Sequence, residues 1–243
     1  MILVIIRVLS AGCRPSEYGR QAEKISRMRK IEELIDKQDP AIKWLRKRAR
    51  EAEVSCELLP PSAERETVLL DTQVTTHSTL GALAYDTGGI FIDDGWLRLL
   101  GSGHSRLTRT LSSWNATRAQ GYYLVGDDAA GGFFALNGGA LWPELRSVYY
   151  WAPDNLEWEC LDLGFTDFVS TFLTSRIITF YEGLRWSTWR DDVRNLSGDR
   201  CFAFYPFLWT REGSPENSHR ATVPVSEAFD MKVDIVKQLS NGT

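Results

Sequence analysis

The sequence of 243 residues has few of the residues that build metal sites, disulfide frameworks and membrane spans. Its four cysteines lie far apart and form no CxxC pair, which argues against a zinc motif or a compact disulfide scaffold. Its three histidines show no HExxH or similar ligand spacing. No stretch reaches the roughly 18 apolar residues of a membrane helix. The sequence therefore predicts a protein of a reducing compartment, the cytoplasm, that does not contact a membrane. The cysteines are Cys13, Cys56, Cys160 and Cys201.

Charge is distributed unevenly along the chain, whose formal net charge is −4. Residues 1–53 carry 13 Lys and Arg against 8 Asp and Glu, or +5, which leaves 15 against 24, or −9, for residues 54–243. The basic side chains between residues 43 and 50 are spaced around one short helix, and we interpret them as a solvated face. The acidic remainder argues against a nucleic-acid partner and favours a protein partner with a basic surface.

Residues 1–27 are predicted to form an N-terminal extension ahead of a single domain over residues 28–243. The apolar start MILVIIRVLS is interrupted by Arg7 and has no basic segment before it, so it fits a secretory signal poorly. Three explanations remain open. The segment is a real part of the protein, a weak export signal, or an upstream extension before a start at Met28.

Hydrophobic periodicity predicts an α+β fold. Helical spacing occurs over 31–35, over 40–52 and again after residue 62. Between residues 83 and 161, six short β-prone runs follow, each bounded by Gly, Pro, Asn or Asp. They predict a central, mainly antiparallel sheet of about six strands, packed by N-terminal helices and by C-terminal helices after residue 165. The runs are GGIFID, WLRLLG, YYLV, FFAL, VYYW and EWECL.

The densest group of special residues is GDDAAGGFFALNGG at 126–139. Its glycines have the spacing of a phosphate-binding loop, but Gly132 stands where the lysine should be, and a calcium loop needs more oxygen ligands. We predict a hairpin, because Asp and Gly are turn residues. The Asp93-Asp94-Gly95 stretch predicts a second hairpin. The sequence predicts no cofactor.

GSGHS at 101–105 contains serine and histidine but lacks the second glycine of a nucleophile elbow, so we predict no catalytic triad there. The strongest compositional signal is nine tryptophans. Most of them are predicted to lie in the core. Trp142, Trp151 and Trp209 are the predicted exposed exceptions, and Trp186 with Trp189 is predicted to pack along one helix.

Four segments carry a resemblance to a known family: TGGIFIDDGWLRLLGSG, LVGDDAAGGFFALNGG, VYYWAPDNLEWECLDLGFTDFV, and FYEGLRWSTW followed by FAFYPFLW. From about Met28 to the C-terminus the chain resembles the bacterial family catalogued as domain of unknown function 2625. The order of glycine-rich strand, acidic turn and GG-aromatic strand is also similar to the SUKH superfamily. That superfamily includes immunity proteins that bind bacterial toxins on an α+β fold without a catalytic centre. The resemblance implies fold-defining roles for Gly88, Gly89, Asp127, Asp128, Gly131, Gly132 and Trp151.

The leading hypothesis is a non-enzymatic protein-binding domain of the toxin-immunity kind, with an acidic and aromatic surface for a basic partner. Two alternatives stay open. The paired aspartates predict a metal-assisted hydrolase if they surround a divalent cation or act as acid and base. Exposed tryptophans predict a small-ligand or glycan-binding module. The candidate binding residues are Asp93, Asp94, Asp127, Asp128, Trp142, Trp151 and Trp209.

Overall fold

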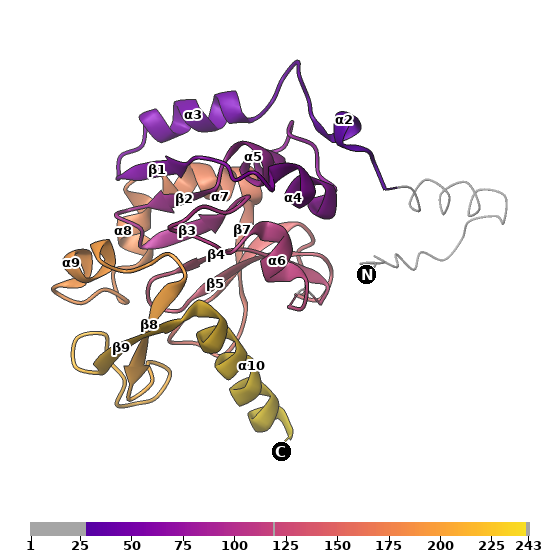
Figure 1. Cartoon of the computed structure of the whole chain (residues 1–243). Coiled ribbons are helices and arrows are strands. Elements are labelled where there is room, and N and C mark those ends of the chain that lie inside the picture. Colours follow the sequence, from indigo (N-terminus) through magenta and orange to yellow (C-terminus); the bar gives the residue numbers. More distant parts are fainter. Residues whose placement is uncertain (1–27, 119, 242–243) are drawn as a thin grey trace.

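The computed structural model describes residues 28–118 and 120–241, so the predicted extension over residues 1–27 lies outside the described residues. The strands form one seven-stranded antiparallel sheet, with helices around it, and one two-stranded sheet (Figure 1). The predicted α+β fold with a central antiparallel sheet is confirmed. The strands are β1 (Cys56–Leu59), β2 (Gly89–Ile92), β3 (Leu97–Leu100), β4 (Tyr122–Asp128), β5 (Phe133–Asn137), β6 (Ser147–Trp151), β7 (Glu159–Gly164), β8 (Arg200–Tyr205) and β9 (His219–Pro224).

The helices lie before, between and after the strands. They are α2 (Ile31–Leu34), α3 (Ile42–Arg50), α4 (Arg65–Thr72), α5 (Thr79–Asp86), α6 (Leu111–Asn115), α7 (Phe165–Phe172), α8 (Arg176–Phe180), α9 (Trp189–Arg194) and α10 (Val225–Asn241). Among the described residues, no helix combines the length and the apolar character that crossing a bilayer requires.

The large sheet is a meander in which neighbouring strands follow one another from β1 to β7. All six predicted strands are present, as β2 to β7. The sequence prediction missed β1, which pairs with β2 from Cys56↔Ile92 to Leu59↔Gly89. It also missed the hairpin of β8 and β9, which pairs from Arg200↔Pro224 to Tyr205↔His219. β1 and β7 are therefore the two edges of the large sheet.

Both predicted hairpins form, and local chemistry explains each turn. Between β2 and β3, Asp93, Asp94 and Gly95 all have positive φ angles of 52°, 59° and 87°. Asp and Gly tolerate this left-handed backbone better than other residues. Between β4 and β5, the Asp128 carboxylate accepts hydrogen bonds from the backbone N–H of Ala130 and of Gly132, both at 2.9 Å.

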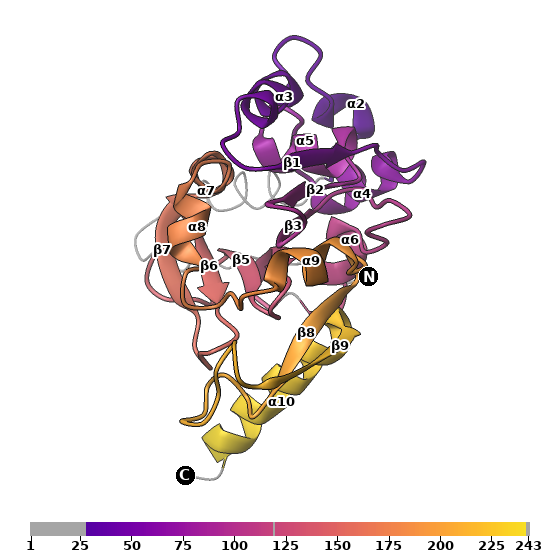
Figure 2. The same cartoon turned by 90° about the vertical axis from the view of Figure 1, so that its left-hand side faces the viewer.

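The two faces of the sheet are covered by different parts of the chain (Figure 2). On one face, the stacked rings of Phe134 and Tyr150 contact aromatic residues of α7 and α8, namely Phe168, Phe172 and Phe180. On the other face, Phe133 and Trp151 pack against Phe229 of α10. Adjacent residues of a strand point to opposite faces of the sheet, so Phe134 packs against α7 and α8 while Phe133 packs against α10.

The two-stranded sheet is attached to the large one through its first strand. The backbone N–H of Phe202 in β8 donates to the carbonyl of Ala129 in the β4–β5 turn at 2.8 Å. Trp186 packs edge-on against Phe202 and Phe204 from the loop before α9. The start of β8 is thereby held close to the end of β4, where the first cluster of charged residues lies.

Candidate functional site

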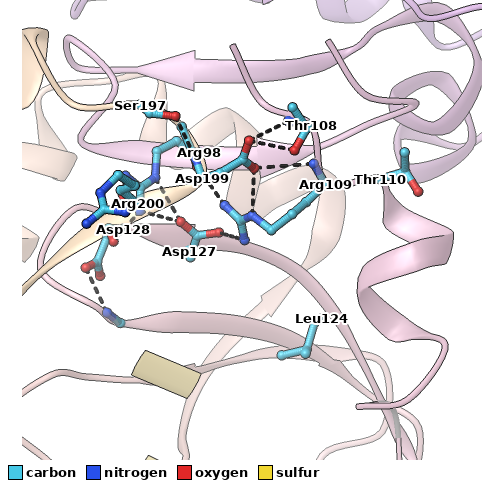
Figure 3. A network of polar contacts seen from close by, with 12 residues as sticks. Arg98, Thr108, Arg109, Thr110, Leu124, Asp127, Asp128, Ser197, Asp199 and Arg200 are labelled. Atoms are coloured by element: carbon cyan, nitrogen blue, oxygen red, sulfur yellow. Dashed lines mark hydrogen bonds and ion pairs between the residues drawn. The ribbon is translucent and has the colours of Figure 1, made fainter. Parts of the chain in front are cut away.

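Asp127, at the end of β4, is fully buried and lies between two arginines (Figure 3). Arg98 is its direct neighbour on β3, and Arg98 Nε donates to Asp127 Oδ1 at 2.8 Å. Arg98 Nη2 bonds the same oxygen, and Arg109 Nη1 donates to Asp127 Oδ2 at 2.6 Å. Both carboxylate oxygens are thus occupied by guanidinium donors, so neither is free to act as a base or as a metal ligand.

The ion-pair chain continues from Arg109 to Asp199, just before β8. Arg109 Nε donates to Asp199 Oδ1 at 3.1 Å, and the N–H and hydroxyl of Thr108 both donate to Oδ2 at 2.8 Å. Burial acts to raise the pKa of Asp199, but the hydrogen bonds from Thr108 and the charge of Arg109 together have the larger effect. The pKa of Asp199 is therefore below its ordinary value. Arg98 Nη1 also donates to the carbonyl of Arg200 at 2.8 Å. This cluster holds β8 against β3 and β4.

Asp128 points away from Asp127, as Figure 3 shows, because neighbouring strand residues face opposite sides of a sheet. The Tyr150 hydroxyl donates to Asp128 Oδ2 at 2.6 Å. Burial raises the pKa of Asp128, although its hydrogen bonds from Tyr150 and Gly132 act in the opposite direction. The two adjacent aspartates therefore do not form an acid–base pair, and each is a separate structural centre.

Asp93 and Asp94 are held by three arginines that come from the loop before α9 and from α9 itself. Arg185 Nη2 donates to Asp93 Oδ2 at 2.5 Å, and Arg190 Nε donates to Asp94 Oδ2 at 2.9 Å. Arg194 Nη2 reaches the same Asp94 oxygen at 3.3 Å. Asp93 is 2% exposed. Of the four aspartates that we predicted as binding residues, three are buried, and arginines, Tyr150 or turn N–H groups occupy their oxygens. Their role in binding stays a prediction that the geometry does not favour.

No group of three or more His, Cys, Asp or Glu that could hold a metal ion occurs within residues 28–118 and 120–241. The motif at 101–105 is likewise structural. Ser102 Oγ donates to the carbonyl of Thr87 at 2.7 Å and accepts from the N–H of Ser62 at 3.0 Å. His104 Nδ1 accepts from the N–H of Arg106 at 3.2 Å. Neither side chain is placed to activate the other.

A groove of about 600 Å³ lies beside the Asp93-Asp94-Gly95 turn. Its floor is the face of β1, β2 and β3, and its opposite wall is the end of α9 with the loop over 195–198. Of the four predicted aspartates, Asp94 lines the groove directly. Asp127 is connected to the groove through its hydrogen bond with Arg98, which is a lining residue. The sequence prediction missed this groove because its residues are scattered from Ser55 to Gly198.

The free edge of β7 has the opposite character. Residues 142–167 contain six carboxylates and one arginine, Arg146. All six carboxylates are exposed, and none forms an ion pair with a described residue. We give the name β7 acidic face to these carboxylates together with Trp142. They lie on β7 (Glu159 and Asp162), in the β5–β6 loop (Glu144), in the β6–β7 loop (Asp154 and Glu157) and at the start of α7 (Asp167). The excess of acids over bases in this stretch is a sequence signal that could have identified it.

Trp142 and Leu145 lie in the loop between β5 and β6, and their side chains are 88% and 64% exposed. The loop stays near β7, because the Tyr149 hydroxyl accepts from the N–H of Glu144 at 3.1 Å and Tyr149 pairs with Cys160 of β7. The prediction that Trp142 is exposed is therefore confirmed.

The structure differs from the predictions for several other tryptophans. Trp151 is 4% exposed and packs against Phe133, Trp158 and Phe229, so its predicted exposure is wrong. Trp209 is half-buried and stacks on Phe207 with ring centroids 4.4 Å apart. Trp186 precedes α9 rather than sharing a helix with Trp189, and both pack against Trp96.

The fold and the buried ion pairs define an α+β protein built on one seven-stranded antiparallel meander. The chain belongs to the family described as "Protein of unknown function DUF2625", whose model matches residues 31–228. It is 42% identical over 212 residues to "Putative uncharacterized protein YbfG" of Escherichia coli (strain K12), covering 84% of this chain and 96% of that protein. No solved structure matches the chain.

A second relative is an "Uncharacterized protein" of Haemophilus influenzae (strain ATCC 51907 / DSM 11121 / KW20 / Rd). It is 39% identical over 191 residues, covering 74% of this chain and 83% of the relative. The resemblance to the family, drawn from four sequence segments, is thus confirmed. The wider similarity to the SUKH superfamily stays a prediction.

Proposed function

We propose that the protein is a non-enzymatic protein-binding domain that docks a partner with a basic surface on its β7 acidic face. The observation that carries the proposal is the combination of six exposed carboxylates, which form no ion pair with a described residue, with the 88% exposed ring of Trp142. A tryptophan so exposed gains buried apolar area only when something covers it. Interfaces are enriched in such aromatic anchors, with charged residues at the rim.

The charge of the face fits a basic partner better than any other class. Residues 142–167 carry a net charge of −5 from six acids and one arginine. Carboxylates at a rim accelerate association with a cationic surface and repel anionic competitors such as nucleic acids. Most of the free energy of binding would then come from Trp142 and its apolar neighbour Leu145, since hot spots cluster at buried anchors.

The partner contacts side chains rather than adding a strand to the sheet. The pairing of β6 with β7 shifts register between Ser147 and Tyr149, and Asp162 of β7 has a left-handed φ of 53°. Irregular backbone and charged side chains are the features by which edge strands avoid pairing with other chains. The docking surface is therefore formed by side chains on both sides of β7.

The similarity to the SUKH superfamily adds a finer expectation, in which the basic partner is a toxin domain that this protein neutralises. On this proposal residues 28–243 act as one domain in the cytoplasm. The free thiols of Cys56, Cys160 and Cys201 favour a reducing compartment. A toxin domain that binds nucleic acid would carry the basic surface that the β7 acidic face requires.

The test is quantitative co-purification with the tagged full chain expressed in its native cells. Trp142→Ala should reduce recovery of the partner by roughly 30-fold, the effect of about 2 kcal/mol at an interface hot spot. Replacing Glu144 and Glu157 by lysine changes the net charge of residues 142–167 from −5 to −1. The double replacement should slow association and should nearly remove the effect of added salt on its rate.

Matched controls are Tyr205→Ala, an exposed aromatic residue on the two-stranded sheet, and the pair Glu64→Lys and Glu66→Lys on or beside α4. These controls should retain the partner. The proposal fails if Trp142→Ala and the lysine variants recover the partner as well as the wild type does. It also fails if the partner whose recovery depends on Trp142 has an acidic surface.

A further inference from the structure

We propose that the groove beside the Asp93-Asp94-Gly95 turn binds a small organic anion with a flat ring, with the ring on Phe91 and the anionic group paired with Arg106 and Arg194. The groove lies at the β1–β3 end of the sheet, whereas the β7 acidic face lies at the other edge. The proposal is therefore independent of the protein-binding function. The volume of the groove, about 600 Å³, falls in the range of roughly 300–1,000 Å³ typical of small-molecule sites.

The floor of the groove is an aromatic ring between two opposite charges. Phe91 pairs across the sheet with Glu57 of β1 on one side and with Arg98 of β3 on the other, so the three side chains share one face. The guanidinium of Arg106 lies over the Phe91 ring, 5.1 Å from its centroid. The position above the ring thus accommodates a flat, delocalised group. A ligand ring takes this position when the half-exposed Arg106 side chain moves off Phe91, and the guanidinium then pairs with the anionic group of the ligand.

The wall opposite the floor comes unusually close to Phe91. A Cβ on Gly198 would lie 2.9 Å from Cζ of Phe91 and 2.5 Å from the carbonyl oxygen of Arg106. Only glycine permits this approach, which brings the loop over 195–198 against the edge of the ring. The groove therefore keeps a narrow cross-section that suits a flat molecule rather than a bulky one.

Two arginines in the lining can exchange partners easily. Arg106 pairs with Glu57, and their side chains are 50% and 56% exposed. Arg194 pairs with Asp94 at 3.3 Å, and its own side chain is 55% exposed. Ion pairs in contact with water add little stability, so a ligand anion can take a guanidinium from either carboxylate at small cost.

The carboxylate partners do not cancel the attraction for an anion. Asp94 is shared by Arg190 and Arg194, so releasing Arg194 leaves Asp94 still neutralised. Arg98 lies at the floor, but its side chain is only 2% exposed, and its bonds to Asp127, Arg200 and Asp128 use four of its five N–H groups. The donors for a ligand are therefore the guanidinium groups of Arg106 and Arg194. A carboxylate or a phosphate group would supply the acceptors for these donors.

The test is isothermal titration calorimetry on the full chain with two anions, benzoate and adenosine monophosphate, and their neutral counterparts, benzamide and adenosine. We expect at least one anion to bind with a Kd below about 1 mM and its neutral counterpart to bind at least about tenfold more weakly. Binding of benzoate alone would assign a carboxylate ligand, and binding of adenosine monophosphate alone would assign a phosphate ligand.

Three variants locate the site. Arg106→Gln and Arg194→Gln should each weaken the bound anion about tenfold or more, and Phe91→Leu should weaken the anion and its neutral counterpart alike. The exposed Arg211→Gln, on the loop between β8 and β9, is the control and should leave the Kd unchanged. The proposal is overturned if neither anion binds below about 1 mM, if the neutral compounds bind equally well, or if folded Arg106→Gln and Arg194→Gln bind like the wild type.

Discussion

The carboxylates at the two ends of the large sheet differ in burial and in ion pairing. At the β2–β4 end, Asp93 and Asp127 are buried, and arginine side chains occupy their oxygens. At the β7 edge, carboxylates such as Glu144 and Glu157 are exposed and have no cationic partner among the described residues. The first group holds segments of the chain together, and the second is available to another molecule.

The difference shows that a pair of adjacent acids in a sequence is a poor guide to a reactive site. The Asp93-Asp94 and Asp127-Asp128 pairs attract attention because turns and active sites use the same residues. Their partners decide between the two roles. A buried carboxylate whose oxygens are all occupied can only be removed at a cost, whereas an exposed one can be replaced almost freely.

The largest expected effect is that of Asp127→Asn. The substitution leaves the buried Arg98 and the mostly buried Arg109 without their shared counter-charge. Removing one partner of a buried ion pair typically lowers the free energy of unfolding by about 3–5 kcal/mol. Urea denaturation followed by tryptophan fluorescence should therefore show a much lower midpoint, or an unfolded protein.

Asp199→Asn is the matched control for this prediction. It removes the other carboxylate that contacts Arg109, but the Asp199 side chain is 25% exposed and Asp127 still neutralises the guanidinium. Its effect should be clearly smaller. Equal stability of Asp127→Asn and the wild type would mean that the arginines find other partners, and the contrast between the two ends of the sheet would collapse.

The next effect concerns Lys232 of α10, a buried cation that lies near carbonyl groups and pairs directly with no carboxylate of the described residues. Its Nζ donates to the carbonyls of Trp151, at 3.3 Å, and of Ala152, and lies 4.6 Å from the centroid of the Trp151 ring. Burial lowers the pKa of Lys232 to about 7, although the charges of Asp128 and Asp154 act to raise it.

The sign of the pH dependence follows from the two states. The unfolded chain holds the Lys232 proton up to a pH of about 10.4, and the folded chain releases it near pH 7, so the unfolded state binds more protons in between. The free energy of unfolding should therefore rise with pH above 7, by about 2 kcal/mol between pH 7 and 9, relative to Lys232→Met. Below pH 7 this contribution should be constant.

Urea denaturation of both proteins at several pH values between 6 and 9 measures this difference. Subtracting the curve of Lys232→Met removes the titration of groups that the two proteins share. Parallel curves would mean that the carbonyl groups and the Trp151 ring keep the ammonium charged in the folded protein. Lys232 would then behave like the arginines at the β2–β4 end.

The strands of the sheet could be predicted from the sequence because each apolar run is bounded by turn residues. β1 was missed because Cys56–Leu59 is short and directly precedes two prolines, which read as a helix break. The β8–β9 hairpin was missed because CFAFYPFLW reads as an aromatic cluster, and its partner strand HRATVP carries almost no apolar pattern. β1 is stabilised by pairing with the apolar strand β2, and β9 by pairing with the apolar strand β8. Such pairing partners cannot be recognised from the local sequence of either strand.

The candidate site was harder to predict because its contacts span long stretches of the chain. Asp93 is 92 residues from Arg185, and Asp127 is 29 residues from Arg98. Neither partner is visible from the local sequence, so the same aspartates could be interpreted as an exposed surface. Trp142 was predicted correctly because it lies between glycine and proline residues in a loop, where a ring has few neighbours to cover it.

The smallest expected effect is that of Glu144→Gln and Glu157→Gln at the β7 acidic face. Neither carboxylate has an ion-pair partner within residues 28–118 and 120–241, so replacing both should change the free energy of unfolding by less than about 0.5 kcal/mol. Their removal should even reduce repulsion among the neighbouring acids. Urea denaturation of the double variant, measured beside Asp127→Asn, checks this. A loss above about 1 kcal/mol would show that these acids also hold the fold together, and the β7 edge would then differ from the β2–β4 end only in exposure.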